Sequence, residues 1–255
     1  MFTAGTLNRL NTAGTVVSLA ALTGLAWLYL FDTAADMDAM MATMPDMPTP
    51  TWDAAYGLTV LLMWAIMMVG MMLPSASPAI LIYQGIARKA ARDGQTVAPT
   101  WLFTSGYLLV WMLFSASATF AQWQLNNTDL LSPMMVSSSA VLGSGLLIAA
   151  GLYQWTPVKN TCLRHCRSPV EFISSHWRKG RRGALLMGWE HGLYCLGCCW
   201  VLMTLLFVGG VMNLLWIALI SIFVLAEKLL PYGDWAGKLV GGLMIAAGIA
   251  LPFYS

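Results

Sequence analysis

Long apolar runs separated by short polar segments extend along the whole chain. A helix needs about 20 consecutive apolar residues to cross a bilayer, and most of the runs approach or exceed that length. The pattern predicts an all-α fold, namely a polytopic transmembrane helix bundle of about seven helices. We therefore expect residues 1–255 to form a single transmembrane domain without a soluble module. The runs cover residues 14–31, 54–73, 99–124, 135–158, 184–208, 211–226 and 238–254.

Charged residues are few, and they are sorted between alternate gaps. They make up 9% of the chain, whereas soluble domains carry roughly 25%. All 13 lysines and arginines precede the first run or follow the second, fourth and sixth, and the other gaps hold only aspartates. Because basic residues favour the cytoplasmic side, we expect a cytoplasmic N-terminus and a periplasmic C-terminus. The chain is then a multi-pass protein of the bacterial inner (cytoplasmic) membrane, with its first run as a retained anchor.

The predicted periplasmic loop 32–52 is rich in methionine and aspartate. A polar, proline-containing loop has no packing reason to hold so many thioethers. Thioether sulfur suits Cu(I), and it has no proton to lose on binding. The alternative is that methionine fills space as a flexible side chain. The candidate ligands are Met37, Met40, Met41, Met44 and Met47.

More methionines follow in the second apolar run. At about 100° per residue, Met63, Met67 and Met71 form one stripe of a helix, and Met68 and Met72 form another beside it. Ordinary core packing competes with a ligand or conduit role, because methionine is common in cores. Met67, Met68, Met71 and Met72 are therefore candidate copper ligands, with packing as the open alternative.

The fifth apolar run carries the strongest constellation. His191 and Cys195 are neighbours at i,i+4, and so are Cys195 and Cys199, while Cys198 lies on the same side of the helix. One straight helix cannot wrap all four around one ion, because the rise from His191 to Cys198 is about 10 Å. Ionisable residues such as Glu190 and His191 are rare in membrane segments and usually functional. The alternative is that the cysteines pack as small apolar side chains.

Two further cysteines, Cys162 and Cys166, lie in the predicted basic cytoplasmic loop 159–183. The cytoplasm keeps thiols reduced, and flanking arginines favour the thiolate that metals require. If this loop folds back on the fifth run, its thiols help to build a structural zinc site, so zinc remains an alternative to copper. Haem is disfavoured, because the chain has no CxxCH motif.

Three stretches carry a resemblance to a known family. They are Met71-Met72-Leu73-Pro74-Ser75, residues 163–169, and His191-Gly192 followed by Cys195-x-x-Cys198-Cys199-Trp200. In these stretches the chain resembles a bacterial family of predicted metal-binding integral membrane proteins, a domain-of-unknown-function family. The resemblance extends from about residue 52 onward and implies a membrane location and metal binding. It implies no particular reaction.

Copper handling is the function that these features favour: transport, storage or delivery of Cu(I) to a metalloenzyme. Partners would be membrane lipid and a membrane metalloenzyme or a periplasmic metal carrier, and no nucleic acid. The chain lacks a GxxxxGK[ST] motif, so any transport must be passive or driven by a gradient or a partner. A membrane-embedded metalloenzyme or oxidoreductase subunit is one alternative, and a structural subunit of a membrane complex is another. Catalysis is therefore left open, with binding favoured over an enzyme.

Overall fold

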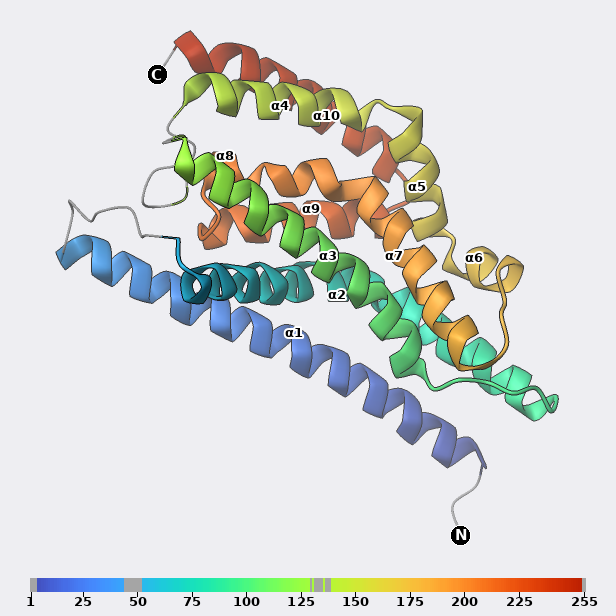
Figure 1. Cartoon of the computed structure of the whole chain (residues 1–255). Helices are drawn as coiled ribbons and strands as arrows, with labels where there is room; N and C mark the ends of the chain where they lie inside the picture. Colours follow the sequence, from blue (N-terminus) through green and yellow to red (C-terminus); the bar gives the residue numbers. More distant parts are fainter. Residues whose placement is uncertain (1–3, 44–51, 129, 131–134, 136–138, 254–255) are drawn as a thin grey trace.

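The computed structural model describes residues 4–43, 52–128, 130, 135 and 139–253, and these residues form helices and short connections without any strand (Figure 1). The prediction of an all-α fold is confirmed. The helices are α1 (Ala4–Thr43), α2 (Ala54–Arg92), α3 (Thr100–Asn127), α4 (Ala140–Gln154), α5 (Pro157–Arg167), α6 (Pro169–Ser175), α7 (Gly180–Thr204), α8 (Leu206–Gly209), α9 (Leu214–Leu229) and α10 (Gly233–Ala250), followed by the 3-10 helix η1 (Leu251–Phe253).

Fewer helices can cross a membrane than the predicted seven. Among the described residues, five helical stretches are long and apolar enough, and α4 with α5 makes a sixth if the pair, bent by 64°, is one span. Helix α9 has 16 residues and is about 24 Å long, which is shorter than the roughly 30 Å hydrocarbon core. The count differs because an apolar run does not by itself fix the length of the helix that it forms, and α9 is too short to span the hydrocarbon core.

Two predicted loops are largely helical. Residues 32–43 continue α1, so Met37 and Met40 lie on a helix, whereas Met44 and Met47 fall outside the described residues. The basic segment 159–183 contains most of α5 and all of α6. Both helices begin with proline at their first position, and the Thr156 hydroxyl caps α5 by accepting from the backbone N–H of Lys159. Proline at this position and a threonine cap are ordinary helix starts.

Close helix contacts hold α7 in the middle of the bundle. Gly106 of α3 and Gly188 of α7 lie where the two helices cross, and a methyl group on either would overlap a backbone oxygen of the other helix. Gly151 and Gly241 make the same kind of contact between α4 and α10. Small residues let helix backbones approach closely. Helix α7 therefore turns one face to α3 and another to α5, and the start of α1 and η1 lie at opposite ends of the bundle in Figure 1.

Candidate metal site on helix α7

The predicted ligand face of α7 points into the protein. His191, Cys195, Cys198 and Cys199 are each at most 3% exposed. Their spacing places them along one side of the helix, and Gly192 on the same helix packs against Val110 of α3. The helix face that the sequence predicts to carry the ligands is thus the face that the fold buries.

The thiols of Cys195, Cys198 and Cys199 are close neighbours. The thiols of Cys198 and Cys199 each donate to the backbone carbonyl oxygen of Cys195, at 3.0 Å. Cys166 of α5 lies beside the thiols of Cys195 and Cys198, where α5 packs against α7. Cys162, one turn earlier on α5, packs over Gly197. The basic segment therefore folds back onto α7 and brings a fourth thiol, that of Cys166, to the three on α7.

Two side chains that the sequence did not single out also meet this cluster. The Lys228 ammonium of α9 lies 3.0 Å from the Cys195 sulfur and 2.9 Å from the Ser75 hydroxyl of α2. The Tyr107 hydroxyl of α3 lies 3.1 Å from the same sulfur and donates to the carbonyl oxygen of Met72. We call the four thiols of Cys166, Cys195, Cys198 and Cys199, together with Lys228 and Tyr107, the thiol cluster. A lysine at the edge of an apolar run was the only sequence signal for Lys228.

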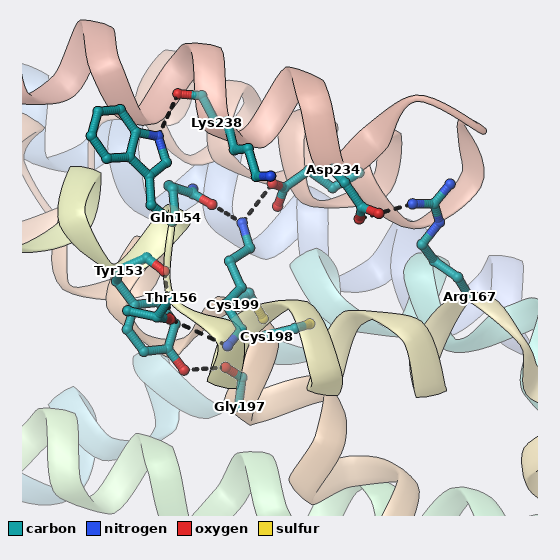
Figure 2. Close-up of polar contacts among 12 residues, drawn as sticks. Tyr153, Gln154, Thr156, Arg167, Gly197, Cys198, Cys199, Asp234 and Lys238 are labelled. Carbon is teal, nitrogen blue, oxygen red and sulfur yellow. Dashed lines mark hydrogen bonds and ion pairs between the residues drawn. The ribbon is translucent and has the colours of Figure 1, made fainter.

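A second buried polar group lies beside the thiol cluster. Lys159 of α5 pairs with Glu227 of α9 at 2.5 Å and also donates to the side-chain oxygen of Gln154. Figure 2 shows Gln154 above Cys198 and Cys199, and Arg167 turned toward Asp234, with which it pairs at 2.9 Å. These contacts fix α5 to α9 and α10, and so they also hold Cys166 in place.

His191 and Glu190 are placed differently from one another. His191 is enclosed by the rings of Phe103, Tyr107 and Phe172, with centroids 5.5–6.0 Å away, and its Nδ1 atom has no hydrogen-bond partner among the described residues. Glu190 is paired with Arg178 at 2.5 Å on a more exposed side of α7. His191 is therefore the better candidate ligand of the two.

The methionines fall into two groups. Met67, Met68, Met71 and Met72 of α2 are all buried in the core. At the far end of the bundle, Met37 of α1 and Met212 line a pocket of about 400 Å³ that also contains Asp38 and Asn213. Met40 is exposed, whereas Met44, Met47 and the Met41 side chain lie outside the described part of the chain.

The thiol cluster is not laid out as a closed metal cage. Among the described residues, no group of three or more His, Cys, Asp or Glu side chains has an arrangement that holds a metal ion. The structural zinc alternative, which needs four ligands in a tetrahedron, has no support. Soft thiolate ligands favour Cu(I), and the donor atoms present here fit that ion.

Comparison with known proteins agrees with this donor set. The PpoB2 family, described as a copper chaperone, matches residues 61–251, from within α2 to the end of the bundle. Searches of the curated proteins and of the solved structures found no match. The match supports a copper-related family, in agreement with the predicted metal binding. It does not support the particular domain-of-unknown-function family that the sequence resembles. The matched region begins after the methionine-rich residues 32–52 and includes the methionines of α2 and all five cysteines. The chain belongs to the PpoB2 family of copper chaperones.

Proposed function

We propose that the chain is a membrane-embedded copper chaperone that holds Cu(I) at the thiol cluster and passes it to a copper-requiring protein. One observation carries the proposal: Cys166 joins the buried Cys195 and Cys198 from a different helix. Packing alone does not require thiols from two helices to converge. Thiolate sulfur selects Cu(I) among soft ions, and the family match names the same metal.

The hydrogen bonds of the cluster describe its unloaded form. The thiols of Cys198 and Cys199 donate hydrogen bonds to the Cys195 carbonyl oxygen. A thiolate has no proton to donate, so these hydrogen bonds are lost when the cysteines are deprotonated to bind a metal. In our proposal these side chains rotate from the carbonyl toward the ion when they bind it. His191, one turn before Cys195, supplies a further ligand through its unpartnered ring nitrogen. A site that closes only around its ion also releases the ion readily, as a chaperone must.

Thioethers at the opposite end of the bundle provide the entry. Met37 and Met212 share a pocket with Asp38, and the distribution of basic residues predicts that this end faces the periplasm. The other buried methionines of α2 lie on the same helix as Met72 and Ser75. The Met72 carbonyl oxygen accepts from Tyr107, and the Ser75 hydroxyl accepts from Lys228, so α2 contacts the thiol cluster. Soft ligands at successive depths let an ion move by exchange between weak sites. The recipient is a membrane metalloenzyme or a periplasmic carrier, and the chain resides in the bacterial inner membrane.

A metal-binding measurement on purified protein tests the proposal. The protein is extracted anaerobically in mild detergent and titrated with Cu(I) against a chromophoric chelator, with bound metals counted by mass spectrometry. We expect tight binding that is lost in Cys195→Ser/Cys198→Ser. Cys162→Ser, which changes a thiol outside the cluster, is the matched control and keeps binding. If the wild type binds no Cu(I), or if the double variant binds it equally well, the proposal is wrong.

A further inference from the structure

Lys228 is a buried cation without a carboxylate partner among the described residues. It is 7% exposed, and its ammonium contacts the Ser75 hydroxyl and the Cys195 sulfur. The neighbouring carboxylate of Glu227 is already paired with Lys159. Consecutive helical residues point about 100° apart, so Glu227 faces α5 while Lys228 faces α7 and α2. A charge at this depth is costly unless an opposite charge accompanies it.

The Lys159–Glu227 pair is neutral as a unit, which leaves the Lys228 charge to be balanced by the cysteine sulfurs of the thiol cluster. Cu(I) held by two thiolates carries a single net negative charge, and the ammonium cancels it. Zn(II) on the same two thiolates is already neutral, and the ammonium would then add an unbalanced positive charge. Net charge in a low-dielectric site is penalised steeply. The cluster is therefore electrically suited to a monovalent ion on two thiolates.

We propose that Lys228 is a built-in counter-ion, which makes the thiol cluster select Cu(I) bound by two thiolates over Zn(II). This inference rests on the proposed function, because it needs copper at the cluster. Lys228 does not bind the ion itself. Its ammonium contacts the sulfur of Cys195 and so balances the net negative charge of the copper–thiolate group, which makes Lys228 a positioning and selecting residue. Only Cys195 among the α7 thiols contacts the ammonium, so the sulfur atoms of Cys198 and Cys199 remain available to an ion.

The test compares Lys228→Met with Lys228→Arg, since methionine keeps the length of the side chain and arginine keeps its charge. Cu(I) and Zn(II) affinities are measured separately, each against a competing chromophoric chelator, at one fixed pH. Lys238→Met is the matched control, because it makes the same change on an exposed lysine of α10. Size-exclusion profiles and thermal unfolding report folding, and Lys228→Gln replaces Lys228→Met if the latter aggregates.

We expect Lys228→Met to weaken Cu(I) binding by about 10- to 100-fold, the range for lost outer-shell partners of metal ligands, while Zn(II) binding is unchanged or tighter. Lys228→Arg keeps the wild-type preference. A general packing defect would lower the affinities for Cu(I) and for Zn(II) together. Equal losses for Cu(I) and Zn(II), or unchanged Cu(I) binding in a folded Lys228→Met protein, overturn the inference while leaving the copper chaperone intact. Absence of Cu(I) binding by the wild type would instead refute the proposed function itself.

Discussion

The ammonium of Lys159 on α5 lies 2.5 Å from the Glu227 carboxylate on α9, and both side chains are 2% exposed. The pair does not ligate sulfur, yet it fixes the helix that carries Cys166. The Lys159 ammonium also donates to the side-chain oxygen of Gln154, so α4, α5 and α9 meet at one buried charge. The position of the fourth thiol therefore depends on an ion pair that lies outside the thiol cluster.

The first prediction concerns this pair. Lys159→Met leaves the Glu227 carboxylate buried without its cation, and we expect a loss of about 3–5 kcal/mol of stability, as for other broken buried pairs. The double variant Lys159→Met/Glu227→Leu removes both charges and should recover much of the loss. Thermal unfolding of the purified protein in detergent measures both. A double variant no more stable than the single one would show that the pair acts through packing and not through charge.

The second prediction concerns the crossing of α3 and α7. Gly188→Ala places a methyl group against the backbone oxygen of Phe103, which no side-chain rotation can relieve. Overpacking of this kind costs typically about 1–3 kcal/mol, and here it also displaces the helix that carries the cysteines. We expect lower thermal stability together with weaker Cu(I) binding.

Gly145→Ala is the control for that experiment. Nothing lies within 4 Å of a methyl group at this position of α4, and alanine favours a helix over glycine by about 1 kcal/mol. Stability should therefore be unchanged or slightly higher. If Gly188→Ala behaved like Gly145→Ala, the α3–α7 contact would be looser than the structure shows.

Local geometry explains which parts of the site could be predicted. The face that carries His191, Cys195 and Cys199 follows from helical periodicity alone, and the structure buries it. The Lys228–Cys195 contact depends on how α9 packs against α7, 33 residues away in sequence. No periodicity encodes such a long-range contact. Adjacent residues on a helix point about 100° apart, so Glu227 pairs with Lys159 while Lys228 contacts Cys195.

The helices in the basic segment were missed for a different reason. The Thr156-Pro157 and Ser168-Pro169 pairs are helix-start signals, and α5 and α6 begin at these prolines. The density of positive charge in residues 159–183 favoured a loop instead. The number of membrane-crossing helices was overestimated because apolar composition predicts burial and does not measure length, as α9 shows.

The third prediction separates packing from conduction in α2. Met67 and Met68 are fully buried, and replacement of methionine by leucine in a core usually costs less than about 1.5 kcal/mol. We expect Met67→Leu/Met68→Leu to remain folded and to keep its equilibrium affinity for Cu(I), because the thiol cluster is intact. Loading of the cluster should become several-fold slower in stopped-flow mixing of reconstituted protein with Cu(I). Loading at the wild-type rate would assign these methionines to packing alone.

The fourth prediction concerns the pocket that Met37 and Met212 share. Leucine at both positions removes the thioether sulfurs while keeping the apolar volume. In proteoliposomes with this end outward, we expect Cu(I) added outside to load the cluster several-fold more slowly in Met37→Leu/Met212→Leu. Binding at equilibrium in detergent should not change, because the thiol cluster is untouched. Met40→Leu, at an exposed position of α1, controls for loss of a surface methionine. Equal loading rates in all three proteins would show that copper enters by another route, and faster loading from the basic end would reverse the proposed direction of transfer.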